Sequence, residues 1–154
     1  FAQWFGTRHT LWLSGEVPGD DTDGHIDNLA RFAGPGCALV VAPDAPRTDV
    51  ERTLAANVDR IATRCDELGL SLDLRPLPLP VAFIAAEQLP ASYANFYIGN
   101  DVVLAPVFAD PSDDAALRVL QDAFPGRRIE PVDARALVVG LGTLHCLTQQ
   151  VPAP

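Results

Sequence analysis

Residues 37–78 read CALVVAPDAPRTDVERTLAANVDRIATRCDELGLSLDLRPLP, and this stretch contains the pattern that decides the fold. Short apolar strands are expected over 37–43 and 70–78. Between them, apolar residues recur every three or four positions over 48–68, which predicts an amphipathic helix with one buried stripe. A Thr-Asp pair suited to capping precedes the stripe, and Gly69 follows it. The stretch therefore predicts a strand, a helix and a second strand.

A second stretch repeats this order. Strands are expected over 101–108 and 127–133, with a helix over 111–124 between them that Pro125 stops. In both stretches an Ala-Pro pair follows the leading strand, and the two pairs are offset by 63 residues. The repeat predicts two strand–strand–helix–strand units in an α/β fold, followed by a closing strand over 136–140.

The composition indicates one globular domain. The chain has 154 residues, of which 48% are hydrophobic and 20% charged, which is sufficient for a packed core. Its net charge is −9, and its 11 basic residues form no cluster. This balance argues against a nucleic-acid partner, because binding phosphates requires clustered Lys and Arg. An acidic surface favours a small cationic ligand instead.

Features of targeting and redox chemistry point to a cytoplasmic protein. No apolar run approaches the roughly 18 residues of a membrane span, and no signal-peptide pattern is visible. The three cysteines form no CxxC pair, which is typical of free thiols in a reducing compartment. The sequence contains no Met and opens with FAQWFG, which looks like the tail of a helix. We therefore expect a piece of a longer protein, or a processed one.

The stretch GDDTDGHIDNLARF, residues 19–32, gathers acidic residues around one histidine. His25 and Asp27 are two positions apart and would point to the same side of an extended segment. Such a pair suits a proton shuttle beside a carboxylate that holds a cationic substrate. A solvated loop with an incidental histidine is the simpler interpretation of this spacing alone.

The segment GLGTLHCLTQQ contains Cys146. A thiol at a strand end, after a tight glycine turn, is placed as nucleophiles often are. An inert thiol is the alternative, and this fits Cys65 and Cys37 better because both lie on apolar segments. Adjacent residues of an extended chain face opposite ways, so we expect His25 rather than His145 to be the partner of Cys146.

A metal-binding module is a weaker hypothesis. His25 and three aspartates, Asp21, Asp23 and Asp27, carry suitable ligand atoms. However, the sequence has no HExxH, CxxC or DxDxDG pattern. We therefore expect no metal.

Taken in their order along the chain, GDDTDGHID, SYANFYI and HCLTQQ resemble the agmatine deiminase and bacterial-type peptidylarginine deiminase family. The resemblance runs over nearly the whole chain and is to the C-terminal portion of such enzymes. It implies a pentein-type α/β propeller of ββαβ modules, here incomplete. Residues 1–154 would be the C-terminal part of a single deiminase catalytic domain, without the N-terminal half and its further substrate-binding carboxylate.

The resemblance also implies a reaction, namely hydrolysis of a guanidinium group to a ureido group and ammonia without a cofactor. It makes Cys146 the nucleophile, His25 the general acid and base, and Asp27 a carboxylate that binds the guanidinium. Asp21 and Asn95 lie in matching motifs and would line the site. Agmatine is the favoured substrate, converted through a Cys thiouronium intermediate to N-carbamoylputrescine in putrescine biosynthesis.

Two alternatives remain open. One is a peptidylarginine deiminase, which modifies arginine in proteins. The other is a catalytically incomplete structural fragment, since the chain alone is expected to hold only part of a site. Exposed module edges would favour a homo-oligomer or pairing with the missing N-terminal half. The chain also departs from the family pattern before its His-Cys pair, where Leu141 and Thr143 replace a small residue and an amide.

Overall fold

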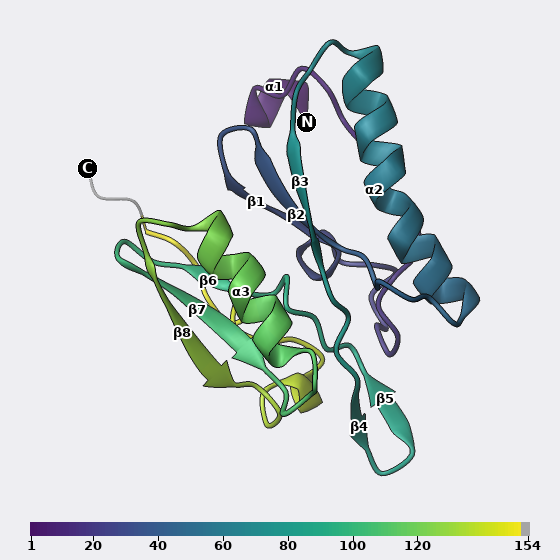
Figure 1. Ribbon diagram of the computed structural model, residues 1–154, viewed down its shortest axis with the longest axis vertical. Coiled ribbons are helices and arrows are strands. Elements are labelled where there is room, and N and C mark those ends of the chain that lie inside the picture. Colours follow the sequence, from purple (N-terminus) through teal and green to yellow (C-terminus); the bar gives the residue numbers. More distant parts are fainter. Residues whose placement is uncertain (152–154) are drawn as a thin grey trace.

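Two ββαβ units follow one another in the computed structural model, which describes residues 1–151 (Figure 1). In the first unit, β1 (Ala30–Gly34) pairs antiparallel with β2 (Cys37–Val41). β2 then pairs parallel with β3 (Asp73–Leu77). The long helix α2 (Asp49–Glu67) connects these two strands and packs against them. The predicted strand–helix–strand order of this stretch is confirmed.

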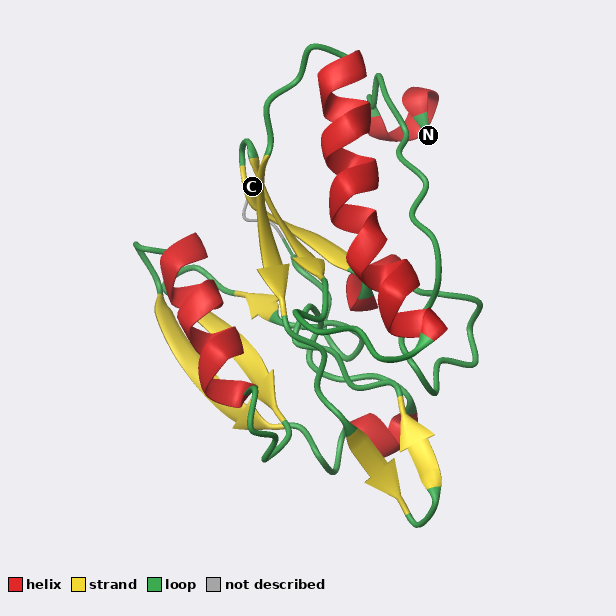
Figure 2. Cartoon of the chain, turned by 45° about the vertical axis from the view of Figure 1, so that its right-hand side comes forward, coloured by secondary structure: helices red, strands yellow, loops and turns green. Residues whose placement is uncertain are grey.

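The second unit has the same topology. β6 (Tyr97–Ile98) pairs antiparallel with β7 (Val102–Val107), which pairs parallel with β8 (Arg128–Asp133). Helix α3 (Asp113–Ala123) connects β7 to β8. The sequence repeat is thus a structural repeat, and each unit forms its own three-stranded sheet. Figure 2 shows loops filling the region between the two units, whereas the long helices lie on the outside.

Shorter elements connect and flank the units. α1 (Ala2–Phe5) opens the chain, and the 3-10 helix η1 (Ile26–Asn28) precedes the first sheet. A two-stranded hairpin of β4 (Ala82–Ile84) and β5 (Glu87–Leu89) lies between the two units in the sequence and projects away from their sheets in Figure 1. In residues 1–151, no helix combines the length and apolar character that crossing a membrane requires.

Local chemistry explains where the main helix begins. Thr48 accepts a hydrogen bond from the backbone N–H of Glu51, and the Glu51 carboxylate accepts one from the backbone N–H of Thr48. This capping box satisfies two backbone donors that the first helical turn leaves unpaired. The predicted stripe is buried at Leu54, Ile61 and Cys65. The packing of this stripe against the sheet holds the helix in place.

A buried segment joins the two units. Residues 92–96, SYANF, are all at most 2% exposed. The Tyr93 ring lies edge-on to Phe108, and the Phe96 ring lies edge-on to Phe124, both with centroids 5.6 Å apart. Such aromatic pairs add to the gain from burying apolar area. The segment is therefore anchored in the core of the second unit.

The predicted closing strand over 136–140 is wrong. This region forms a turn and the 3-10 helix η2 (Val138–Gly140), after which Leu141 adopts a left-handed conformation with φ 65°. Val138 is fully buried whereas Val139 is 48% exposed. Val138 anchors this short turn in the core, and the segment pairs with no strand within residues 1–151. The turn redirects the chain toward the buried segment between the units.

Candidate active site

Two residues from opposite ends of the sequence meet at the candidate site. Asp27 lies in η1, and Cys146 lies in a turn over residues 144–147. The Cys146 thiol donates to Oδ2 of Asp27 at 3.4 Å. The Asp27 side chain is 14% exposed, whereas Cys146 is exposed. Cys146, exposed as a whole residue, therefore holds its thiol against a largely buried carboxylate.

The Asn95 side chain holds the turn that carries Cys146. Its Oδ1 accepts hydrogen bonds from the backbone N–H groups of Thr143, His145 and Cys146 at 3.2, 3.0 and 3.3 Å. It also accepts from the Thr143 hydroxyl at 2.9 Å. One carbonyl oxygen thereby binds three backbone donors of a loop that forms no regular ladder.

The amide nitrogen of Asn95 contacts the side chains of the candidate carboxylate and thiol. Nδ2 lies 3.1 Å from Oδ2 of Asp27, 3.1 Å from Sγ of Cys146 and 2.9 Å from Oδ1 of Asn28. Asn95 is only 1% exposed. The predicted site residue is therefore brought into the cluster, but it lies beneath Asp27 and Cys146 and not on a surface open to a substrate.

His145 also joins the cluster, although the sequence favoured His25 as the partner of Cys146. Its Nδ1 is 2.6 Å from Oδ2 of Asp27, the same oxygen that Cys146 contacts. The expectation that His145 faces away from Cys146 is wrong, because it assumed an extended chain. Residues 144–147 form a turn, in which neighbouring side chains do not alternate between two faces.

His25 and Asp21 lie apart from this cluster. Both are exposed, and in the described residues neither side chain makes a hydrogen bond. His25 precedes η1, and its backbone N–H donates to Oδ2 of Asp20 at 3.4 Å. Since Asp27 lies in a 3-10 helix, the argument that His25 and Asp27 share one side of an extended segment does not hold. His25 is nevertheless close enough for its charge to favour ionised Asp27.

The thiol and the carboxylate are shifted in opposite directions. Burial opposes ionisation of Asp27, but hydrogen bonds from His145 and Cys146 outweigh it and hold the pKa of Asp27 below its ordinary value. Burial raises the pKa of Cys146, and the nearby Asp27 charge raises it further against the hydrogen bond from Asn95. The site thus combines a carboxylate ion with a neutral thiol.

Arg31 is a cation near the site that sequence reasoning did not single out. Its Nη1 donates to the carbonyls of Ala94 and Phe96 at 3.3 and 3.0 Å, and its guanidinium lies 4.8 Å from the Phe96 ring centroid. Burial lowers the pKa of Arg31, while the negative charge of Asp27, and that of Cys146 once it is ionised, oppose that shift. The residue therefore ties β1 to the buried segment that carries Asn95. Its place after the GHID motif was the only available signal.

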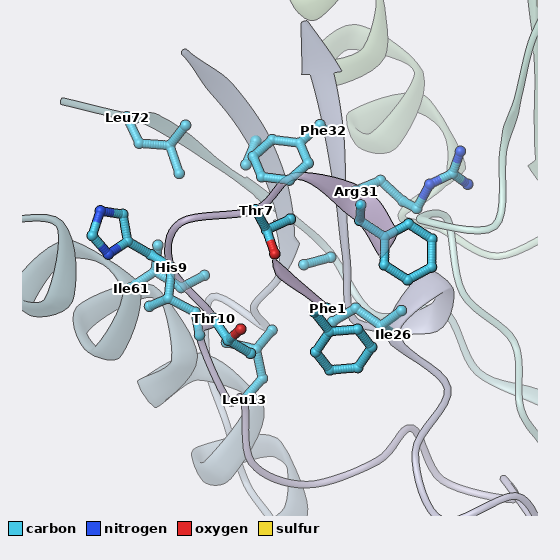
Figure 3. A pocket seen from close by; sticks show the side chains of 14 residues that line it. Phe1, Thr7, His9, Thr10, Leu13, Ile26, Arg31, Phe32, Ile61 and Leu72 are labelled. Carbon is cyan, nitrogen blue, oxygen red and sulfur yellow. The ribbon is translucent and has the colours of Figure 1, made fainter. Parts of the chain in front are cut away.

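A separate apolar cavity of about 470 Å³ lies against β1 and the N-terminal segment (Figure 3). Arg31 lies at the opposite end of this cavity from His9 and Leu72 in that view. Neither Cys146 nor Asp27 lines it. In the described part of the chain, no group of three metal-ligating side chains is clustered.

Comparison with solved structures identifies the class of fold. Over 94% of this chain and 42% of the other, a C. jejuni agmatine deiminase with bound substrate superimposes with a TM-score of 0.84 at 30% identity. The agmatine deiminase of Enterococcus faecalis gives a TM-score of 0.86 at 27% identity, covering 98% of this chain and 46% of the other. The α/β fold is that of agmatine deiminases.

The sequence comparisons give the family. The chain belongs to the Porphyromonas-type peptidyl-arginine deiminase family, whose pattern matches residues 1–152. The agmatine deiminase of Pseudomonas fluorescens is 34% identical over 163 residues, which cover 94% of this chain and 44% of that enzyme. The chain therefore spans less than half the length of these relatives.

Proposed function

We propose that this chain carries the nucleophile of an agmatine deiminase-like hydrolase and is part of a single catalytic domain built as a propeller of ββαβ modules. One observation carries the proposal. The thiol of Cys146 and a carboxylate that stays ionised, Asp27, share a hydrogen bond in a site that Asn95 holds together. Attack on the carbon of a guanidinium requires both groups, a nucleophilic thiol and a negative charge that binds the cation.

Asp27 would bind the substrate. A guanidinium is planar and cationic, and a carboxylate binds it through charge-assisted hydrogen bonds. The low pKa of Asp27 keeps the carboxylate charged, and its burial strengthens attraction to a cation. Asp21 is exposed in the loop that precedes η1. We propose that it lines the complete site.

Cys146 would attack the guanidinium carbon. Its raised pKa keeps the free thiol neutral, and a bound cation offsets the Asp27 charge and favours the thiolate. Attack forms a C–S bond and a tetrahedral adduct. His25 protonates the leaving nitrogen, ammonia departs and a thiouronium remains. His25 then takes a proton from water, which attacks the same carbon, so that the C–S bond breaks and the ureido product leaves.

Agmatine is the substrate that we propose, with N-carbamoylputrescine as product and a role in putrescine synthesis. The sequence relative and the two solved structures described above are named agmatine deiminases, which supports this choice over arginine in proteins, the substrate in the family's name. His25 does not contact Cys146 among the described residues, so the rest of the domain would complete the geometry. The experiment must distinguish this function from the alternative, which is a catalytically incomplete fragment.

A labelling race tests the proposal. The chain is treated with 2-chloroacetamidine, which mimics a guanidinium, or with neutral 2-chloroacetamide, and the modified cysteine is mapped by mass spectrometry. We expect the amidine to modify Cys146 selectively, and agmatine to block it more strongly than an arginine peptide does. Cys37 and Cys65 serve as internal controls.

Matched variants make the result specific. Asp27→Ala and His25→Ala should reduce amidine labelling, whereas Asp44→Ala and His9→Ala, at exposed positions outside the site, should not. Ammonia release from agmatine is measured in parallel. Slow labelling of all three cysteines at similar rates with both reagents would refute a working cation site in this chain.

A further inference from the structure

We propose that His145 is a positioning residue of this site, whose imidazole fixes the orientation of the Asp27 carboxylate toward the cationic substrate. The proposal rests on the proposed function, because it concerns how Asp27 meets a cation. It adds a residue that the sequence reasoning set aside.

The geometry concentrates three donors on one oxygen. Oδ2 of Asp27 lies 2.6 Å from Nδ1 of His145, 3.1 Å from Nδ2 of Asn95 and 3.4 Å from Sγ of Cys146. The His145 contact is the shortest of the three. A carboxylate oxygen has two lone pairs, so three donors saturate Oδ2.

The other oxygen is left free. Among residues 1–151, Oδ1 of Asp27 accepts no hydrogen bond, and no buried side-chain oxygen lacks a partner there. Oδ1 is therefore accessible enough to meet solvent or a ligand. By occupying Oδ2, His145 directs the remaining acceptor of Asp27 outward, where a guanidinium would bind.

The position of His145 suits this task. Its backbone N–H is held by Oδ1 of Asn95 at 3.0 Å, and its side chain is 32% exposed. The backbone anchor fixes the ring beside Asp27. For Nδ1 to donate to a carboxylate ion, it must carry a proton, which selects one tautomer of the neutral ring.

The first test compares three variants at position 145 in the 154-residue chain. The readout is the ratio of Cys146 modification rates by 2-chloroacetamidine and 2-chloroacetamide. His145→Ala should lower this ratio about tenfold, through loss of one charge-assisted bond. His145→Asn places an amide nitrogen close to the position of Nδ1 and should restore the ratio to within about threefold. His145→Gln, whose amide mimics Nε2, should not.

A double variant shows whether His145 acts through Asp27. The combined His145→Ala and Asp27→Ala variant should have the same ratio as Asp27→Ala alone, because the two residues belong to one interaction. A general loosening of the Cys146 turn would instead change the rates with both reagents by a similar factor in His145→Ala and leave their ratio unaltered. Circular dichroism confirms that each variant is folded.

A second test does not depend on the proposed function. Nitrogen-15 NMR of the His145 ring should show the proton on Nδ1, and Asp27→Asn should shift the ring toward the other tautomer. An unchanged tautomer overturns the proposal, as does additive loss in the double variant. If the unaltered chain shows no amidine selectivity, the proposed function fails and the positioning role fails with it. The NMR result then shows whether the His145–Asp27 contact itself is real.

Discussion

The side-chain nitrogen of Asn95 lies 3.1 Å from Sγ of Cys146, although 51 residues separate them in the sequence. Asn95 belongs to the buried segment between the two units, and its oxygen holds the backbone of the turn that carries the thiol. The buried side-chain amide of Asn95 therefore fixes the position of the candidate nucleophile, Cys146. Its role as a support, and not as a contact for substrate, has direct consequences for mutagenesis.

Asn95→Ala should destabilise the chain by about 2–4 kcal/mol, because it leaves several buried donors and acceptors unpaired. Chemical unfolding measures this change. Asn100→Ala, at an exposed position in the following loop, is the control and should have an effect within about 0.5 kcal/mol. Equal stability of the two variants would contradict the structural role of Asn95.

The pH dependence of Cys146 alkylation should report on Asp27. Burial and the Asp27 charge raise the pKa of the thiol, so the midpoint should lie above the ordinary cysteine value. Asp27→Asn removes the negative charge and should move the midpoint to lower pH. The rate of iodoacetamide modification, mapped to Cys146 by mass spectrometry, measures both midpoints. A higher midpoint in Asp27→Asn would show that the sign of this coupling is wrong.

Acid should weaken the fold partly through Asp27. Since its pKa in the folded chain is below the ordinary 3.8, ionised Asp27 stabilises the fold above that value. This contribution is lost as pH falls through the lower, folded-state pKa. Asp27→Asn should therefore be less stable than the unaltered chain at pH 6, and the difference should shrink below pH 3. Urea unfolding at several pH values checks this; a difference that grows in acid would contradict it.

Gly142→Ala should displace the thiol without unfolding the chain. A Cβ at Gly142 would lie 2.8 Å from Cβ and 2.9 Å from Sγ of Cys146, closer than these atoms can approach. We expect selective amidine labelling of Cys146 to fall at least about tenfold, a loss typical of misplaced reactive groups. Gly140→Ala, where an added Cβ meets nothing within 4 Å, should leave labelling unchanged. Equal labelling of the two variants would rule out this steric effect.

Leu141→Gly should stabilise the chain by about 0.5–1 kcal/mol. Leu141 adopts φ 65°, which costs a residue with a Cβ roughly 1–2 kcal/mol, and its side chain is 40% exposed. This conformation explains why a small residue is expected before the His-Cys pair. Val139→Gly, two residues earlier and also exposed, is the control and should be destabilising. Thermal unfolding compares them, and a less stable Leu141→Gly would refute the strain.

The repeat and both long helices could be predicted because their signals are local. The apolar stripe over α2 and its capping box lie within one stretch, and the leading strands of the two parallel pairs, β2 and β7, are short apolar runs. The ALVVG segment, residues 136–140, is an exception. It has the composition of a strand, but one of its residues fills the core and its neighbour faces solvent, so it turns where a strand was expected.

The sequence by itself determined the ββαβ repeat, the family and the residue types that the proposed chemistry needs, since periodicity and motifs are written along the chain. Only the tertiary structure decided how those residues meet. It brought Asp27, Asn95 and Cys146 together, turned His145 into the cluster and left His25 outside it among the described residues. The reason is physical: side-chain direction in turns depends on backbone dihedrals and long-range hydrogen bonds, which residue spacing does not encode.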